Sequence, residues 1–236
     1  MKIHRFIVSE LTGSLVEGDT ISLGDGDMVH QLVRVLRMKG GDTIILCDNK
    51  GKDYLVSLKE LSRESVSGVI KEVRPVAPIG RDVMMCVALV KGSRFDETLL
   101  HLVEVGVSSI VPLITDRTEK KDLNQERALR ILKEGAEQSG RGTVPYLHPI
   151  MKLEEAFALA QSEGRELVWC DTGLGETKKP SGTKLALFVG PEGGFTESER
   201  ELAKKISVLP ASLGQTILRA ETAALVAGYG AVNGTL

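Results

Sequence analysis

Cysteine and histidine are scarce in this chain of 236 residues. The three cysteines, Cys47, Cys86 and Cys170, are odd in number and far apart, so they predict neither a disulfide framework nor a paired-cysteine metal site. The four histidines are never clustered, and neither a Ser–His–Asp triad nor an HExxH zinc motif can be built from them. The sequence therefore favours reduced, buried thiols and gives no support for metal catalysis or triad hydrolysis.

Long apolar runs and a surplus of charge are missing as well. No stretch approaches the ~20 apolar residues that a membrane span needs, and the N-terminal MKIHRFIVSE has no signal-peptide apolar region. We therefore expect a cytoplasmic protein without a membrane partner. The net charge is −2, and neither residues 1–74 (11 basic, 11 acidic) nor residues 75–236 (19 basic, 21 acidic) are basic overall. A surface for RNA would have to be a local patch.

The first 74 residues are expected to be β-rich. Short apolar runs separated by turn residues predict a small β-barrel, with strands at 3–8, 20–23, 42–47, 54–58 and 65–73. Met28–Met38 has helical spacing instead, and Gly40–Gly41 is expected to end that helix.

A basic face is predicted on this helix. His30, Arg34 and Arg37 follow one another at i, i+4 and i+7, and Arg5 and Lys39 are nearby basic residues. Such a face could contact the phosphates of a nucleic acid. The alternative is an ordinary solvated helix face, and spacing alone does not decide between the two.

RPVAPIGR at 74–81 contains two prolines and a glycine, which predict a domain boundary. The pattern of apolar residues changes after it. From residue 82, apolar strands alternate with helices, which predicts a mostly parallel sheet covered by helices on both faces. Strands are expected at 83–90, 109–114, 166–170 and 185–189, and helices at 95–105, 123–138, 153–161 and 221–232. Thr196 and Glu199 form a T-x-x-E capping box that opens a further helix.

Two glycine-bearing loops follow apolar runs in this second part. GPEGGF at 190–195 lies between a buried strand and the capped helix, where open parallel sheets bind ligands. It is neither a P-loop nor a GxGxxG fingerprint, and the alternative is a tight strand–helix turn. LGQTILRAETAA at 213–224 places Arg219 and Glu221 between an apolar run and a small-residue helix, which could also be a surface ion pair at a helix start.

A third motif, EQSGR at 137–141, ends the long helix. Arg141 could bind the last carbonyl groups of that helix, or Glu137 and Arg141 could face a substrate. Spacing leaves both readings open.

Taken together and in this order, FVGPEGGF, LGQTILRAETAA, EQSGR and HQLVRVLRM closely resemble the RsmE family, the 16S rRNA uracil-1498 N3-methyltransferases. The resemblance covers essentially the whole chain, and the first two motifs are highly specific as a pair. The chain departs from the family's usual pattern at His101, Ala128 and Gly135, which leaves substrate contacts in that region open.

The resemblance implies an α/β protein with two domains. Residues 75–236 would form a SPOUT-type methyltransferase domain with a deep trefoil knot, and residues 1–74 a PUA-like β-barrel that binds RNA. It also implies S-adenosylmethionine as cofactor, no metal, 16S rRNA or the small ribosomal subunit as partner, and a homodimer with active sites at the subunit interface.

The resemblance further assigns site residues. Cofactor binding falls to residues of the strand ends and the two glycine loops, namely Cys170, Thr172, Val189, Gly190, Pro191, Glu192, Gly193, Gly194, Leu213, Gly214, Ile217 and Leu218. Uracil N3 carries a proton at neutral pH, so a base or a group that stabilises the anionic ring is useful. Arg219 and Arg141 are candidates for stabilising that charge, and Glu137 and Glu221 are weaker candidates for the base. Arg5, His30, Arg34 and Arg37 would contact the RNA backbone.

Two other function classes fit the sequence less well. A SPOUT enzyme that methylates the ribose 2′-hydroxyl would be expected to lack this N-terminal barrel and the ILRAETA segment. A non-enzymatic RNA-binding factor would not need the intact glycines of both loops and Arg219.

Overall fold

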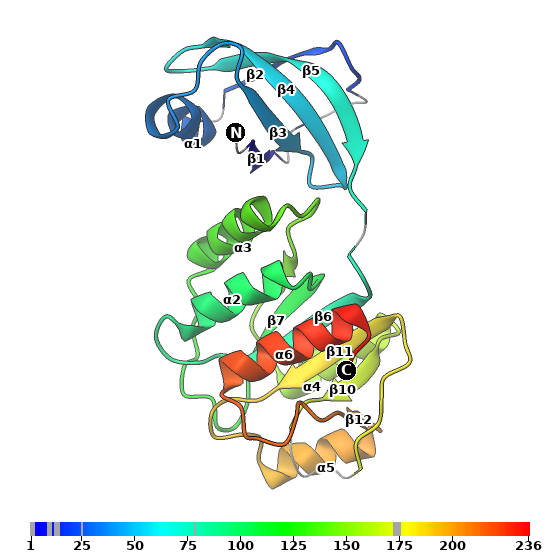
Figure 1. Ribbon diagram of the computed structural model, residues 1–236. Helices are drawn as coiled ribbons and strands as arrows, with labels where there is room; N and C mark the ends of the chain where they lie inside the picture. The colour runs from blue at the N-terminus through cyan, green and yellow to red at the C-terminus, as the bar shows by residue number, and fades with distance from the viewer. Residues whose placement is uncertain (1–2, 9–10, 12–14, 25, 78, 172–175) are drawn as a thin grey trace. The chain divides into compact units, whose positions relative to one another are not determined.

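The computed structural model describes every residue except 1–2, 9–10, 12–14, 25, 78 and 172–175. The chain forms two compact units, drawn in Figure 1. The first comprises Met1–Pro78 together with Ala136–Thr143, and the second comprises Ile79–Gly135 together with Val144–Leu236. The first unit is therefore built from two separate stretches of sequence.

The first unit contains a five-stranded sheet in the order β1-β3-β4-β5-β2. Its strands are β1 (His4–Ile7), β2 (Thr20–Leu23), β3 (Thr43–Cys47), β4 (Lys52–Leu61) and β5 (Val66–Pro75). Strand β1 runs parallel to β3, and the other pairs are antiparallel. All five strands lie where they were expected, and the described residues record no pairing between β1 and β2 that would close the sheet into a ring.

The helix expected at 28–38 ends earlier than predicted, and its second half is a π-helix. An α-turn, α1 (Gly26–His30), continues as a π-helix, η1 (Gln31–Val35), in which Leu36 N donates to Gln31 O at 2.9 Å. The prediction that Gly40–Gly41 ends it is wrong, because the helical turns stop at Val35 and Arg37 takes a left-handed φ of 52°. The β-branched valines of this segment are weak helix formers, and short π-turns are rare interruptions that sequence spacing does not reveal.

The second unit is built around a parallel sheet in the order β12-β10-β11-β6-β7-β8, with β9 also pairing with β7. The strands are β6 (Asp82–Ala88), β7 (Ser109–Ile114), β8 (Tyr146–Leu147), β9 (Met151–Lys152), β10 (Glu166–Trp169), β11 (Lys184–Val189) and β12 (Leu209–Pro210). Every pair is parallel, as the alternation of strands and helices predicts. The two-residue strands were not expected, since two residues leave no readable period.

Helices cover both faces of this sheet, which confirms the layered prediction. They are α2 (Arg94–Glu104), α4 (Leu153–Ser162), α5 (Glu197–Lys205) and α6 (Ala220–Asn233), while α3 (Gln125–Ser139) packs against α2, with Gly135 beside Leu100 and Val103. Alternate strand residues such as Met84, Trp169 and Phe188 share a core with α4 and α5. Helices α2 and α6 pack together on the other face (Figure 1). The capping box at Thr196 is formed as predicted: its hydroxyl accepts from Glu199 N, and the Glu199 carboxylate accepts from Thr196 N.

Candidate functional site

The second unit contains a cavity of about 360 Å³, lined by residues that follow strand β10 and by residues between β12 and the start of α6. It lies where β10 and β12 end, at the carboxyl edge of the parallel sheet, which is where this architecture binds ligands. The lining residues come from the segments directly after these two strands and from the start of α6: Cys170, Asp171, Thr177, Pro210, Ala211, Ser212, Leu213, Gly214, Thr216, Ile217, Leu218 and Ala223.

Five predicted cofactor residues, Cys170, Leu213, Gly214, Ile217 and Leu218, therefore share one cavity. Their proximity follows from the sheet, because β10 and β12 are neighbours and Ala211 N donates to Trp169 O at 2.9 Å. The wall is mostly apolar with a few hydroxyl groups, a composition typical of small-molecule sites.

Glycine is required in this wall at one point. Gly214 has a φ of 125°, a conformation that other residues adopt only with strain, and its N–H donates to Ser212 Oγ at 3.3 Å. The turn that follows presents Ile217 with 97% of its surface exposed. An apolar side chain left so open beside a cavity is available to contact a bound molecule.

The GPEGGF loop lies at the carboxyl end of β11, next to β10 in the sheet. Gly194 has a φ of 65° and its N–H donates to Pro191 O at 2.8 Å, while Glu192 pairs with Arg94 at 3.1 Å. The loop residues predicted to bind cofactor, Val189, Gly190, Pro191, Glu192, Gly193 and Gly194, are not in the cavity wall itself. Thr172, the remaining predicted residue, lies outside the described part of the chain.

Two arginines tie these loops to neighbouring elements. Arg117 donates through Nη1 to Gly193 O at 2.6 Å and to Phe195 O at 3.3 Å, which connects the segment after β7 to the GPEGGF loop. Arg200, on α5, donates from Nε at 3.1 Å and from Nη2 at 2.9 Å to Asp171 Oδ2. The carboxyl edge of the sheet is therefore cross-linked by charge-assisted hydrogen bonds.

Two aromatic residues, one at the end of β10 and one at the end of the GPEGGF loop, pack against each other in the core of the second unit. The rings of Trp169 and Phe195 have centroids 3.9 Å apart, and both side chains are fully buried. Cys170, the next residue, is also buried, and burial raises the pKa of its thiol to about 12, with the nearby Asp171 carboxylate acting in the same direction. The thiol is therefore neutral at physiological pH and serves as a small apolar part of the wall.

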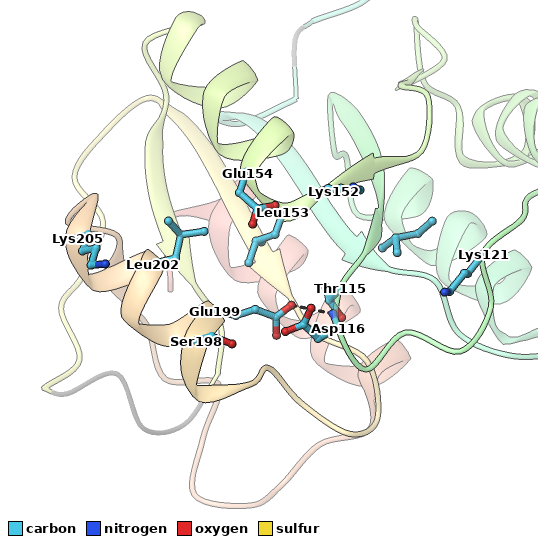
Figure 2. Close-up of a pocket in the computed structure, with 11 residues that line it drawn as sticks. Thr115, Asp116, Lys121, Lys152, Leu153, Glu154, Ser198, Glu199, Leu202 and Lys205 are labelled. Carbon is cyan, nitrogen blue, oxygen red and sulfur yellow. Dashed lines mark hydrogen bonds between the residues drawn. The ribbon is translucent and has the colours of Figure 1, made fainter.

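A second cavity, of about 640 Å³, lies beyond the ends of β7 and β9, between α4 and α5 (Figure 2). Its floor carries Asp116 and Glu199, which are joined by a hydrogen bond in the figure. Three basic and three acidic residues line this cavity, so their formal charges cancel: Lys121, Lys152, Lys205, Asp116, Glu154 and Glu199. None of the residues predicted to bind cofactor, substrate or RNA lines it.

The three predicted catalytic residues are divided between the units. Arg219 is the exposed N-cap residue of α6, directly after the cavity residue Leu218, and forms no ion pair with any described residue. The alternative of an Arg219–Glu221 ion pair is therefore not realised. Oε2 of Glu221 is buried without a hydrogen-bond partner.

Arg141 and Glu137 belong to the first unit. Glu137 Oε1 accepts from Ile7 N at 2.8 Å, and Arg141 O accepts from Arg5 Nη2 at 2.8 Å. Arg141 is 5% exposed, and burial lowers the pKa of its guanidinium to about 10. At neutral pH it remains charged, so the EQSGR segment holds a buried cation close to the first strand.

The predicted RNA-contacting residues also separate into two environments. His30, Arg34 and Arg37 are exposed, while their neighbours Met28 and Leu32 are buried in the core of the first unit. Arg5 is instead largely buried in an ion pair with Asp53, with side-chain exposures of 10% and 14%. The exposed group is thus available to a partner, and Arg5 is held inside the fold.

The site residues named from the sequence left out four polar residues of the cavity wall, Asp171, Thr177, Ser212 and Thr216. Asp171 carried a usable signal, because it follows a buried strand at the edge where parallel sheets bind ligands. It is also the only residue with a formal charge at neutral pH in the wall described above.

Within the described residues, no group of three or more His, Cys, Asp or Glu side chains is placed to hold a metal ion. Among the helices that these residues form, none combines the length and apolar character needed to cross a bilayer.

Two family models match the chain. An RNA methyltransferase domain matches residues 77–229, and an RNA methyltransferase PUA domain matches residues 25–71. The first spans the parallel sheet and the cavity, and the second spans most of the antiparallel sheet and the exposed basic residues.

Similar proteins and structures extend over nearly the whole length. Ribosomal RNA small subunit methyltransferase E of Rickettsia conorii is 28% identical, with 96% of this chain and 94% of that protein covered. The protein of the same name from Synechocystis is 33% identical, with coverages of 84% and 68%. A crystal structure of ribosomal RNA small subunit methyltransferase E from Neisseria gonorrhoeae bound to S-adenosylmethionine matches with a TM-score of 0.86 and 31% identity, covering 96% and 95%. A Legionella pneumophila methyltransferase with bound S-adenosylmethionine matches with a TM-score of 0.83 and 27% identity, covering 98% and 97%.

Proposed function

This chain belongs to the RNA methyltransferase family of ribosomal RNA small subunit methyltransferase E, and from that membership we propose that it methylates N3 of one specific uridine in 16S ribosomal RNA. It is an S-adenosylmethionine-dependent rRNA methyltransferase. The observation that carries the assignment is the single cavity formed by Cys170 and the 213–218 loop at the carboxyl edge of a parallel sheet.

The cavity fits S-adenosylmethionine in size and chemistry. A volume of about 360 Å³ lies within the range of roughly 300–1,000 Å³ that is usual for small-molecule sites. Leu213, Ile217 and Leu218 would cover the adenine ring, while the hydroxyl groups and the Asp171 carboxylate would meet its polar parts. When bound, the cofactor supplies a methyl group already activated by a sulfonium. The protein therefore has mainly to align acceptor and donor, which lowers the barrier by about 7–11 kcal/mol in favourable cases.

Arg219 is the residue we assign to the anionic uracil ring. It follows the cavity wall directly, is exposed, and has no ion-pair partner among the described residues, so its charge is available to the acceptor. A fixed cation at the place where negative charge develops stabilises the transition state without reorganisation. Arg141 is kept as a second candidate for stabilising that charge, and Glu137 as a candidate base, although Glu137 Oε1 already accepts a hydrogen bond from Ile7 N. These roles of Arg141 and Glu137 are secondary parts of the proposal.

The first unit would hold the RNA. His30, Arg34 and Arg37 are exposed and would bind phosphates, while the Arg5–Asp53 pair would support the strand beneath them. N3 lies on the Watson–Crick edge of uracil, so a paired target base would have to leave its helix before reacting.

The experiment that tests the function is methyl transfer from labelled S-adenosylmethionine to 16S rRNA and to small ribosomal subunits, with the product nucleoside identified by mass spectrometry. N3-methyluridine at one position is expected, and 2′-O-methylation or an absence of transfer would contradict the proposal. Arg219→Ala should retain cofactor binding and lose about 100-fold or more in turnover, in line with losses of single charge-stabilising groups. Wild-type turnover in that variant would exclude the role of Arg219.

We also propose that the protein acts as a homodimer. Val226 and Tyr229, one turn apart on α6, are 38% and 57% exposed, and Leu100 and Leu129 on neighbouring helices are partly exposed too. Exposed apolar side chains on the helices of the second unit favour association with a second copy. Sedimentation velocity should give a dimer, and Tyr229→Asp should shift it toward monomer; a monomeric wild-type protein would overturn this part.

The resemblance further suggests that the last strands and the last helix are threaded through a loop as a trefoil knot. The strand order β12-β10-β11-β6, in which the last strand adds beyond β10, is compatible with such a path. If the chain is knotted, stretching a single molecule from its termini will stop short of the length of an unknotted chain, and full extension would refute the knot.

A further inference from the structure

Among the described residues of the cavity wall, Asp171 is the only one with an ionisable carboxyl or a basic side chain, and its two oxygens have different surroundings. Both hydrogen bonds from Arg200 go to the same oxygen, Oδ2, at 3.1 Å from Nε and 2.9 Å from Nη2. Among the described residues, none donates a hydrogen bond to the other oxygen, Oδ1. The carboxylate is thus half satisfied by the protein and half available to a ligand.

The ion pair between Arg200 and Asp171 is largely buried. The Arg200 and Asp171 side chains are only 21% and 17% exposed, so the pair is largely withdrawn from water. A Cβ added at Gly194 would lie 4.0 Å from Oδ1, which places that oxygen beside the GPEGGF loop as well as the cavity. Oδ1 is not among the buried side-chain atoms that lack a partner, so water reaches it, and a hydroxyl group of a ligand can replace that water.

The charge of the pair favours a neutral donor over a cation. Arg200 compensates the Asp171 charge through Oδ2, so the pair as a whole exerts little long-range attraction. A hydroxyl group can still donate a charge-assisted hydrogen bond to Oδ1 without bringing a charge out of water. In a nucleoside cofactor, the neutral donors of this kind are the ribose hydroxyls.

We propose that Asp171 Oδ1 accepts a hydrogen bond from a ribose hydroxyl of the bound cofactor, and that Arg200 is the positioning residue that holds Asp171 for this task. The inference rests on the proposed function, since it identifies which part of S-adenosylmethionine the cavity's polar residue recognises. No other charged side chain of the described wall competes for that role.

The test compares adenosine with 2′,3′-dideoxyadenosine, each measured calorimetrically in competition with S-adenosylhomocysteine. The wild-type protein should prefer adenosine by about tenfold to a hundredfold, as expected for a hydrogen bond to a charged group. Asp171→Asn should reduce this preference to near one while leaving the affinity for the dideoxy compound almost unchanged. If Asp171→Asn instead weakened the binding of both compounds equally, the substitution would have disturbed the cavity in general, and the proposal would be overturned.

Arg200 variants give a second, independent measurement if Asp171→Asn fails to fold. Arg200→Met should lower the preference several-fold, and Arg200→Lys should restore part of it, because lysine keeps the charge but not the two-point contact. Glu197→Gln is the matched control, since the exposed Glu197 touches Arg200 only at 3.6 Å, and it should leave the preference intact.

The outcomes separate this inference from the function itself. If the wild-type protein binds cofactor and methylates rRNA while Asp171→Asn keeps the full preference for adenosine, only the role of Asp171 is refuted. If Asp171→Asn weakens the binding of S-adenosylhomocysteine but not that of 5′-methylthioadenosine, the carboxylate contacts the amino-acid part of the cofactor. The assignment to a ribose hydroxyl is then refuted. A wild-type protein that binds no cofactor would overturn both proposals.

Discussion

Oε1 of Glu199 accepts a hydrogen bond from the backbone N–H of Asp116 at 2.9 Å, although 83 residues separate the two (Figure 2). The other oxygen of Glu199 accepts from Thr196 N at 2.7 Å. The carboxylate therefore serves twice: it completes the capping box that opens α5, and it fastens the start of that helix to the segment after β7. Helix α5 also carries Arg200, which holds Asp171 in the wall of the 360 Å³ cavity. The contact between Glu199 and Asp116 therefore helps to position a residue of that wall.

We predict that Glu199→Gln destabilises the second unit by about 1–3 kcal/mol. Glu199 is 8% exposed, and the amide would turn an NH2 group toward one of two backbone donors, leaving that donor unpaired. Urea unfolding can be followed through Trp169, the only tryptophan in the chain. Glu201→Gln is the matched control: Glu201 lies two residues along α5, its side chain is 53% exposed, and it makes only a surface pair with Lys204, so the midpoint should hardly change. Equal effects of both variants would contradict the argument.

The ion pair of Arg5 with Asp53 gives a prediction for the first unit. Asp53→Ala should destabilise by about 3–5 kcal/mol, because it leaves the Arg5 guanidinium charged and buried without its partner. The pair is bidentate, with Nη2 2.6 Å from Oδ1, and Arg5 also donates to Arg141 O. Thermal unfolding by circular dichroism measures the loss. Glu72→Ala, which breaks the exposed pair with Arg74, is the control and should have little effect, as surface pairs do.

Sequence reasoning succeeded where the signal was local. Apolar runs such as 83–90 predicted buried parallel strands, and Thr196 with Glu199 predicted a helix start, because each depends on neighbouring residues. The meeting of Cys170 with Leu213 and Leu218 was foreseeable as well, since both segments follow strands of one parallel sheet.

It failed where contacts join distant parts of the chain. Nothing near Arg5 signals Asp53, and nothing near Ala136 signals that this stretch belongs to the first unit. Such contacts are chosen by tertiary packing, which leaves no period in the sequence. The π-turn before Arg37 was missed for a related reason: a single wider turn changes the spacing by one residue and ends the helix early.

Gly190 is predicted to tolerate no side chain. A Cβ there would lie 2.9 Å from Phe195 Cε2, and that ring is fully buried against Trp169. Gly190→Ala should therefore displace Phe195, cost about 1–3 kcal/mol as overpacking does, and shift the fluorescence maximum of Trp169. Weaker cofactor binding should accompany the shift. Gly24→Ala, where a Cβ meets nothing within 4 Å, should change none of these properties; an unshifted spectrum for Gly190→Ala would count against the packing argument.

The buried thiols predict a loss of stability at high pH. Burial raises the pKa of Cys86 strongly and that of Cys170 to about 12, whereas thiols of the unfolded chain titrate near pH 8.5. The stabilisation is complete below the unfolded pKa and declines as pH rises toward the folded value, because only the unfolded state then releases protons. Each thiol should contribute a fall of about 1.4 kcal/mol per pH unit in that window. Urea unfolding at pH 8, 9 and 10 measures the slope, and Cys86→Ala should make it shallower; an identical slope would contradict the assignment.

The exposed basic residues of the first unit predict a salt effect on RNA binding. If Arg34 and Arg37 bind phosphates, Arg34→Ala/Arg37→Ala should weaken binding and reduce the slope of log K against log salt by about 1.4 for a single-stranded target, because two fewer phosphates are neutralised and each releases about 0.7 counterions. Both side chains are exposed, so the fold should be unaffected. Lys59→Ala/Arg63→Ala removes the same charge from elsewhere in the first unit and serves as control, with a smaller change expected. Fluorescence anisotropy with a labelled rRNA fragment at several salt concentrations gives the slope. An unchanged slope in the Arg34/Arg37 variant would show that these residues do not bind phosphates, and RNA binding would then have to be assigned to another surface.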